Sequence, residues 1–354
     1  MVVKEKKLTN NYKEYQREAI EQIWRKALTI EEKLDYCRPN FSQVSNNKLN
    51  EWKNIKGLIK EETFEEILFY RKITKEEFAF GVSDFKEEFP KNIPDWLLLV
   101  NEVFSEYIFK ENEIDDIGVS VLPFINYVEQ KIQATTFIDS AIDLHSEVQE
   151  SFIHSYVVDI LQIVSKVLVI ELELYKKSHP EVLKDSDQCF NHFLKTIFSD
   201  KKSYYQFFSK YAVCTRQIAT RTKFALDNYL KFIAAIEESQ AELKGLLSIS
   251  KLCIQKVHLS AGDSHEQGKN VSIVEISNKK VVYKPKNLEV TQSFEKLVSW
   301  FNQRSSLLEM KVPRGIYYKQ YSFCEFISYD SCQTEEEVAN FYRRLILREL
   351  RLQN

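Results

Sequence analysis

The fold is decided by residues 262–302, which read GDSHEQGKNVSIVEISNKKVVYKPKNLEVTQSFEKLVSWFN. This stretch opens with a polar loop that has a glycine at each end, Gly262 and Gly268. Two β-branched runs follow, at 271–276 and 281–284, and the polar residues 277–280 between them are typical of a turn. Pro285 ends the second run, because proline has no N–H to donate to a sheet. The stretch therefore predicts a loop followed by a β-hairpin.

A helix is expected after the hairpin, because apolar residues recur at i, i+3, i+4 and i+7: Phe294, Leu297, Val298 and Phe301. Beyond it, residues 316–318 and 323–327 have the composition of strands. Thr334 and Glu337 have the spacing of a capping box, which predicts a last helix that runs to the C-terminus.

The part of the chain before this stretch predicts helix after helix. Apolar residues recur at helical spacing, for example at Tyr156, Ile160 and Val164. The chain has 7 glycines, whereas average usage would give roughly 25, and so few helix breakers favour helix. We therefore expect an α+β protein that is predominantly α-helical. Its parts would be a helical region over 1–250, a small β-containing lobe over 251–332 and the start of a further helix over 333–354.

Composition excludes several classes of protein. The formal net charge of −3 gives no basic field for nucleic acid. The most apolar window, 157–170, is too short to cross a bilayer, and the N-terminus lacks the apolar core of a signal peptide. None of the 6 cysteines forms a C-x-x-C pair, so the spacing predicts no metal site, and we expect small buried thiols. The expectation is a cytoplasmic protein that is not transmembrane.

The glycine-bounded loop and Lys284 are the candidates for chemistry. Glycines allow a backbone to approach phosphate oxygens closely, and a strand lysine facing such a loop is how kinases hold the phosphates of ATP. Asp263 and His265 are unusual in a phosphate loop, and a histidine there is suited to acid–base work near neutral pH. Spacing alone leaves the alternative open, since a surface loop with a solvated lysine gives the same pattern.

The quoted stretch resembles the dehydratase domain of class II lanthipeptide synthetases (LanM). In that family a G-D-x-H-x-x-G loop leads into a hairpin ending in Y-K-P, and the next helix closes in W-x-N-like residues. Residues 321–326 are similar to the family's Y-x-W-x-E-F, with Phe323 in place of tryptophan, and residues 336–344 are similar to E-E-V … F-Y-x-R. The likeness is specific from about residue 205 to residue 344.

The resemblance implies a helical region followed by a lipid-kinase-like small lobe. It also implies an enzyme that uses ATP and Mg²⁺ to phosphorylate Ser and Thr of a ribosomal precursor peptide. Elimination of the phosphate then gives dehydroalanine or dehydrobutyrine. Carried over by position, Asp263, His265 and Lys284 are the catalytic residues, and Gly262, Gly268 and Lys284 contact the nucleotide. By analogy with kinases, Glu295 would pair with Lys284.

The chain departs from the family after the F-Y-x-R helix. There the family continues with a D-x-H-x-E-N catalytic loop, a metal-binding aspartate and a zinc-dependent cyclase, whereas this sequence ends at Asn354. We therefore expect the large lobe to be missing, an apolar face to be exposed, and activity to require a complementing C-terminal chain. Two alternatives stay open: a non-catalytic helical module that binds a precursor peptide or a partner protein, and an unrelated helical protein with a coincidental loop.

Overall fold

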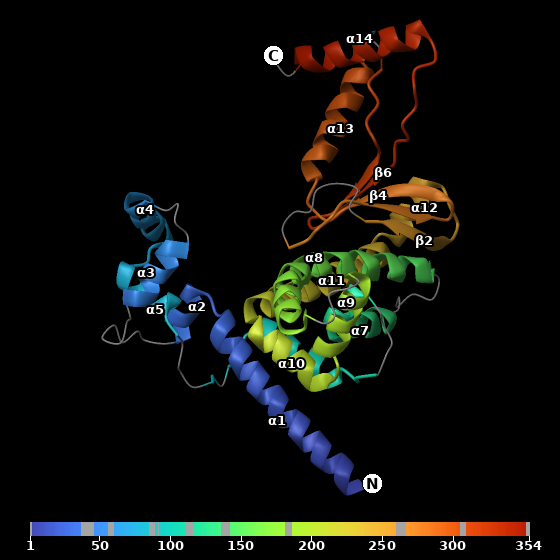
Figure 1. The fold of residues 1–354 in the computed structure, drawn as a ribbon. Helices are drawn as coiled ribbons and strands as arrows, with labels where there is room; N and C mark the ends of the chain where they lie inside the picture. Colours follow the sequence, from blue (N-terminus) through green and yellow to red (C-terminus); the bar gives the residue numbers. More distant parts are fainter. Residues whose placement is uncertain are drawn as a thin grey trace. The chain divides into compact units, whose positions relative to one another are not determined.

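The computed structural model describes residues 2–36, 46–55, 60–84, 89–90, 92–110, 116–135, 142–180, 186–259, 267–304 and 309–351 (Figure 1). The chain divides into two compact units. The first comprises Met1–Val128 and Val157–Lys223, and the second comprises Glu129–Tyr156 and Phe224–Asn354. Residues 251–354, which the sequence assigned to a lobe and a further helix, thus fall in the second unit together with two helical segments. The predicted class, mainly helical α+β, is confirmed.

The first unit is helical and has an aromatic core. Its long helix α1 (Val2–Ala27) packs along α10 (Lys201–Lys210) and also contacts α6 (Asp95–Glu106). Phe104 of α6 lies 4.8 Å from the ring of Tyr205 and 5.8 Å from that of Phe208. The remaining elements of this unit are η2 (Ile117–Val121), the start of α7 (Leu122–Gln133), α9 (Ser186–Ile197), most of α8 (Ser146–Ser178) and the first part of α11 (Ala212–Glu238).

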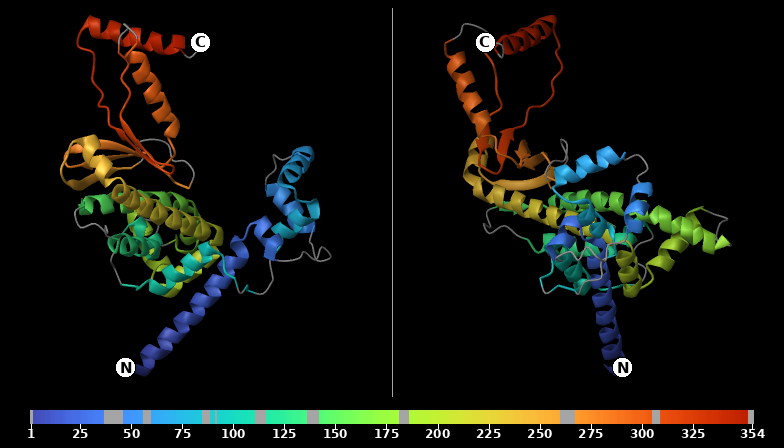
Figure 2. Two further views of the ribbon diagram at one scale, coloured as in Figure 1. Left: turned by 180° about the vertical axis from the view of Figure 1, so that it is seen from behind. Right: turned by 90° about the vertical axis from the view of Figure 1, so that its left-hand side faces the viewer.

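Four short helices of the first unit form a cluster of their own, coloured blue in Figure 1 and seen from two further directions in Figure 2. They are α2 (Ile30–Tyr36), α3 (Asn46–Ile55), α4 (Glu61–Arg71) and α5 (Lys75–Val82). Leu49, Phe64 and Phe78 are among the side chains of their common core. Lys33 is 8% exposed and donates to the backbone oxygens of Gly81 and Ser83 at the C-terminal end of α5.

The second unit is built around a six-stranded sheet with the order β1-β2-β3-β4-β6-β5. The strands are β1 (Ile142–Leu144), β2 (Leu252–His258), β3 (Ser272–Ile276), β4 (Lys279–Lys284), β5 (Gly315–Tyr317) and β6 (Ser322–Glu325). β1 and β2 are parallel, and the other neighbours are antiparallel.

The predicted hairpin is confirmed, with a tighter turn than the sequence indicated. Ser277 and Asn278 alone make the turn, at φ 48° and 64°, and two positive φ values are those of a type I′ hairpin. Lys279 and Lys280 accordingly belong to β4 rather than to the turn. The strand predicted over 323–327 ends at Glu325, and Ile327 is 65% exposed. β1 and β2 were not predicted.

Helices lie on both faces of the sheet. On one face, Tyr283 of β4 packs edge-on against Phe232 of α11, which in turn contacts Phe152 at the start of α8. Helix α12 (Gln240–Leu247) contacts β5, and Lys279 donates to its Leu247 carbonyl. On the other face, Tyr317 of β5 donates to Glu295 of α13 (Glu289–Asn302). This helix buries Val298 and extends away from the sheet (Figures 1 and 2).

The predicted apolar stripe of α13 exists but is largely unburied. Phe294 and Leu297 are 49% and 59% exposed, and Trp300 is 52% exposed. The expectation of an exposed apolar face is met at these side chains. The final helix α14 (Glu335–Arg351) begins with the predicted capping box, in which the Glu337 N–H donates to Thr334 Oγ1 and Glu337 Oε2 accepts from the Thr334 N–H. Among the helices described, none is both long enough and apolar enough to cross a membrane.

Candidate functional site

Lys284 is the last residue of β4 and lies on the α13 side of the sheet. Along β4 the buried side chains are Val281 and Tyr283, so the alternation of a strand directs Lys284 to the opposite face. Its partner in the ladder is Ser322 of β6, whose hydroxyl donates to the backbone oxygen of Lys286. The described residues include no acidic side chain in an ion pair with Lys284.

Cys324 places Lys284 and Glu295 in the same neighbourhood. Cys324 is opposite Val282 in the β4–β6 ladder, which puts it on the same face as Lys284. Burial raises the pKa of the Cys324 thiol, the Lys284 ammonium opposes that rise, and the Glu295 carboxylate adds to it. Both charges thus act on one buried sulfur atom. The strand lysine and the helix glutamate, which the analogy with kinases would pair, therefore both influence the pKa of Cys324.

Glu295 is nevertheless held by a different partner. The hydroxyl of Tyr317 on β5 donates to Glu295 Oε1. Burial and this hydrogen bond raise the pKa of Tyr317, so the phenol stays protonated and keeps donating. In the described part of the chain no ion pair joins Glu295 to Lys284, and the assignment of Glu295 to a nucleotide site stays a prediction.

The end of the glycine loop reaches the same end of the hairpin as Lys284. Ser272 is opposite Tyr283 in the β3–β4 ladder, so the chain that enters β3 runs beside the end of β4. Gln267 and Gly268 have φ values of 63° and 76°, and the second is the left-handed conformation that glycine adopts without strain. The backbone oxygen of Gln267 accepts from Asn228 of α11 at 3.2 Å, which fixes the loop end. Gly262, Asp263 and His265 lie outside the described residues.

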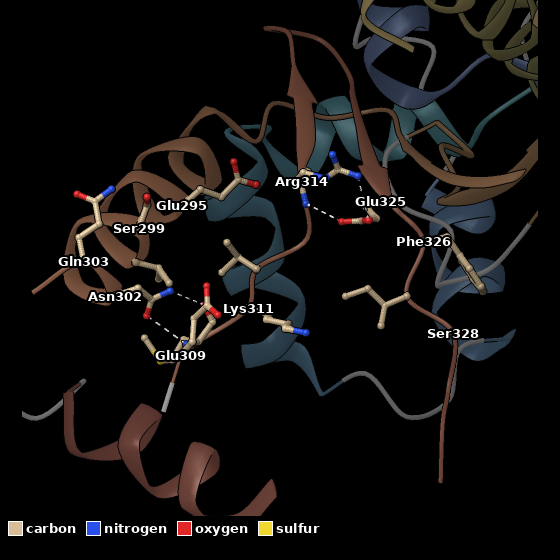
Figure 3. Close-up of a pocket in the computed structure, with 14 residues that line it drawn as sticks. Glu295, Ser299, Asn302, Gln303, Glu309, Lys311, Arg314, Glu325, Phe326 and Ser328 are labelled. Atoms are coloured by element: carbon tan, nitrogen blue, oxygen red, sulfur yellow. Dashed lines mark hydrogen bonds and ion pairs between the residues drawn. The ribbon is translucent and has the colours of Figure 1, made fainter. Parts of the chain in front are cut away.

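A hollow of about 980 Å³ opens between α13 and the chain around β5 and β6 (Figure 3). Glu295 lies on its rim, and across it Arg314 pairs with Glu325 at 3.4 Å. On the α13 side the Asn302 side chain both accepts from and donates to the backbone of Met310. Lys284 is not among the residues that line it. Because its lining mixes acidic and basic groups, the hollow does not by itself indicate a phosphate site.

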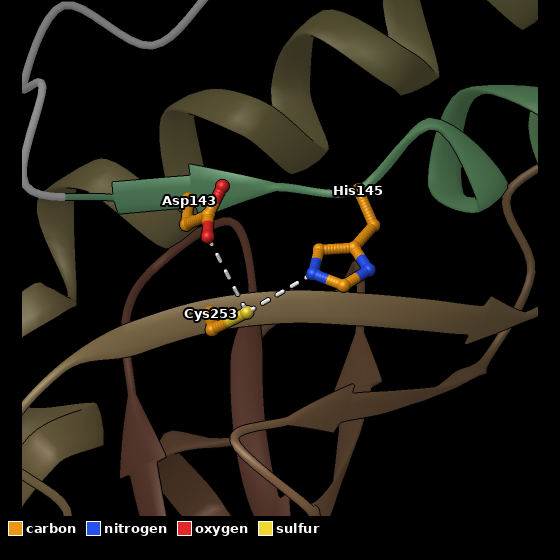
Figure 4. A group of neighbouring side chains, drawn as sticks. All are labelled: Asp143, His145 and Cys253. Atoms are coloured by element: carbon orange, nitrogen blue, oxygen red, sulfur yellow. Dashed lines mark hydrogen bonds between the residues drawn. The ribbon is translucent and has the colours of Figure 1, made fainter.

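A second group of side chains, of types that bind metal ions, was not anticipated from the sequence. Asp143 and His145 at β1 meet Cys253 of β2, and their ligand atoms lie within 4.8 Å of one another (Figure 4). The letters from Asp143 onward read D-x-H-x-E, but Val148, which is fully buried, stands where the family's catalytic loop has asparagine. The only sequence signal was two ligand-type residues two apart; their cysteine partner is 110 residues from Asp143.

The comparisons with known proteins bear on the second half of the chain. No curated protein matches this sequence. One family model matches part of the chain, from Tyr211, just before α11, into α14. The matched range includes every strand of the sheet except β1. Residues 211–346, which include Lys284, Cys324 and Glu295, match the family described as a domain of unknown function, DUF4135.

Proposed function

We propose that this chain is the N-terminal part of a LanM-type dehydratase and supplies the side of its active site that holds the ATP phosphates. The observation that carries the proposal is the coincidence of the family match at 211–346 with the sheet that bears Lys284. The matched domain is known from lanthipeptide-synthetase-like proteins. The order of a glycine-bounded loop, a hairpin with a terminal lysine and a helix on the lysine side supports the same assignment.

The proposed roles follow from the chemistry of each group. Lys284 holds phosphate oxygens with a compact positive charge, and Gly268 lets the backbone approach them. Asp263 and His265 belong to the same loop, and the resemblance places them at the reacting phosphate. ATP with Mg²⁺ supplies the phosphoryl group for Ser and Thr of a ribosomal precursor peptide. The described residues fit the phosphate end of ATP, since none of them pairs a carboxylate with the Lys284 ammonium; they assign no ligands to Mg²⁺.

The nucleotide role is tested by replacing Lys284. A hydrogen bond to a charged group contributes about 1.5–3 kcal/mol, which corresponds to roughly 10- to 100-fold in affinity. We expect Lys284→Met to weaken the binding of Mg·ATP to the purified chain by that factor in a calorimetric titration. Lys280→Met is the matched control, because Lys280 lies on the same strand and pairs with Glu275. Equal losses in both variants, or none in Lys284→Met, would contradict the proposal.

The dehydratase role is tested with a complementing chain. Phosphoryl transfer needs a base for the substrate hydroxyl and ligands for the metal as well as a phosphate-holding lysine. The proposal assigns the phosphate-holding part to residues 211–346 and assigns them no base or metal ligand. We expect mass spectrometry to show phosphorylation and loss of water on a Ser/Thr-rich precursor peptide when a polypeptide with a D-x-H-x-E-N loop is supplied, and to show neither when Lys284→Met replaces the unaltered chain. Dehydration that persists with Lys284→Met would refute the proposal.

A non-catalytic binding module is the second candidate, and the exposed side of α13 favours it. Val290 is 84% exposed, and Phe294, Leu297 and Trp300 follow it on the same helix with about half of each side chain exposed. An amphipathic peptide could bury such a stripe. Retained peptide binding without any Mg·ATP binding would support the module. Mg·ATP binding that depends on Lys284 would support the dehydratase.

A further inference from the structure

The sheet brings three metal-ligand side chains together at its β1 edge. Asp143 is opposite Cys253 in the parallel β1–β2 ladder, so the two side chains share a face. His145 follows two residues after Asp143, and side chains two apart on an extended chain point the same way. The backbone N–H of His145 donates to the Ile254 oxygen at 3.0 Å, which continues the register one residue past β1. The cluster is therefore positioned by backbone pairing.

The two distances from the Cys253 sulfur atom are close to the ligand separations around a tetrahedral ion, and all three ligand atoms lie within 4.8 Å of one another. Cys253 Sγ lies 3.4 Å from His145 Nε2 and 3.7 Å from Asp143 Oδ2 (Figure 4). Zn–S of about 2.3 Å with Zn–N or Zn–O of about 2.0–2.1 Å at tetrahedral angles gives ligand separations of about 3.5 Å. The two distances to sulfur fall on either side of that value. The distances from the Cys253 sulfur atom to His145 Nε2 and to Asp143 Oδ2 therefore already have the length that a zinc site requires.

We propose that Asp143, His145 and Cys253 form a zinc site that ties the edge strand β1 to β2. One thiolate, one imidazole and one carboxylate suit a borderline-soft ion better than Ca²⁺ or Mg²⁺, which take oxygen ligands. Binding breaks the S–H bond of Cys253, forms a Zn–S bond and releases the proton to solvent. Asp143 and His145 are exposed and Cys253 is half-buried, so the fourth position opens to solvent.

The groups around the cluster allow zinc to replace the proton of Cys253. Lys251 is the nearest competitor, with its Nζ 3.8 Å from Asp143 Oδ2, and both side chains are more than half exposed. An exposed pair of that length is weak, so an ion that binds three ligands displaces it. β1 has three residues and lies at the edge of the sheet. A metal clip would therefore stabilise a short strand that pairs with a neighbour on one side only.

The first test uses the unaltered full-length chain after treatment with a chelator. Iodoacetamide labels accessible cysteines, and peptide mass spectrometry follows the labelling rates with and without added Zn²⁺. At a zinc concentration of 100 times its Kd, mass action leaves about 1% of the site free, so alkylation of Cys253 should slow about 100-fold. The exposed Cys332 should be unaffected. Equal rates at Cys253 with and without zinc, or equal slowing at both cysteines, would overturn the proposal.

The second test identifies the ligands with Co²⁺ as a spectroscopic probe. One equivalent should give a thiolate-to-cobalt charge-transfer band that Cys253→Ser abolishes and Cys332→Ser retains. His145→Gln and Asp143→Asn should each weaken binding at least about tenfold. His258→Gln should not, because His258 lies on β2 but pairs with Glu275 at 3.0 Å. Circular dichroism checks that each variant folds. A cobalt–thiolate band that survives in folded Cys253→Ser would refute the assignment.

Discussion

Tyr321→Phe should destabilise the sheet-bearing unit by about 1.5–3 kcal/mol, the contribution of a hydrogen bond to a charged group. The Tyr321 hydroxyl donates to Glu238 Oε2 at 2.7 Å and lies 3.1 Å from the hydroxyl of Ser239. Ser239 is fully buried, and Tyr321 itself is 8% exposed. Burial raises the pKa of Tyr321, so the phenol remains a donor at neutral pH. The ring keeps its stacking on Tyr318 in the variant, so the loss isolates the polar contacts.

Urea unfolding measures this loss as a shift in midpoint at an unchanged m-value. Tyr329→Phe removes the same atom from a ring that is 92% exposed, and should change stability by less than about 0.5 kcal/mol. A double-mutant cycle with Glu238→Gln should give a coupling energy of about 1 kcal/mol or more. If Tyr321→Phe matches Tyr329→Phe, or if the cycle is additive, the hydroxyl does not connect α11 to the β5–β6 turn.

Further predictions concern glycines and a buried lysine. Gly315→Ala would put a Cβ 2.4 Å from the end of the Tyr317 ring; we expect the ring to leave Glu295 and thermal melting to show a loss of about 1–3 kcal/mol. Gly245→Ala is its control with the opposite sign, because a Cβ there meets nothing within 4 Å and alanine favours a helix by about 0.5–1 kcal/mol. Burial lowers the pKa of Lys33 below 10.5, so between the lowered pKa and 10.5 the unfolded chain binds a proton that the folded chain has released. Stability should therefore rise as pH increases towards 10.5, and Lys33→Met should remove that slope in urea titrations at several pH values.

Local signals account for what the sequence predicted correctly. The hairpin follows from two β-branched runs around a turn, and the capping box of α14 from Thr334 and Glu337 three residues apart; both depend on neighbours along the chain. The apolar stripe of α13 illustrates the limit of such signals. Its spacing predicted one apolar face correctly, but periodicity carries no information on whether anything covers that face, and only Val298 is buried.

Long-range pairing accounts for what the sequence did not predict. β1 has three residues, and its parallel partner β2 begins with Leu252, opposite Ile142. No turn connects parallel neighbours, so no local pattern marks them. The absence of C-x-x-C spacing led us to expect no metal site, yet the β1–β2 pairing places Cys253 beside His145, 108 residues away. For the proposed phosphate site the sequence pointed to Lys284 and Glu295, whereas the hydrogen bond that holds Glu295 comes from Tyr317, which no motif indicated.

The two proposed sites lie on one sheet but should act independently. Lys284 ends β4 and Cys253 lies on β2, with β3 between them in the strand order. Neither side chain has a hydrogen bond or ion pair to a group of the other site in the described residues. Lys284→Met should therefore leave the cobalt–thiolate band unchanged, and Cys253→Ser should leave the Kd for Mg·ATP within about twofold, since non-contacting substitutions usually add within about 0.3–0.5 kcal/mol. If either variant lost both cobalt binding and Mg·ATP binding, the substitution would have disrupted the sheet. That variant would then give no evidence for either site.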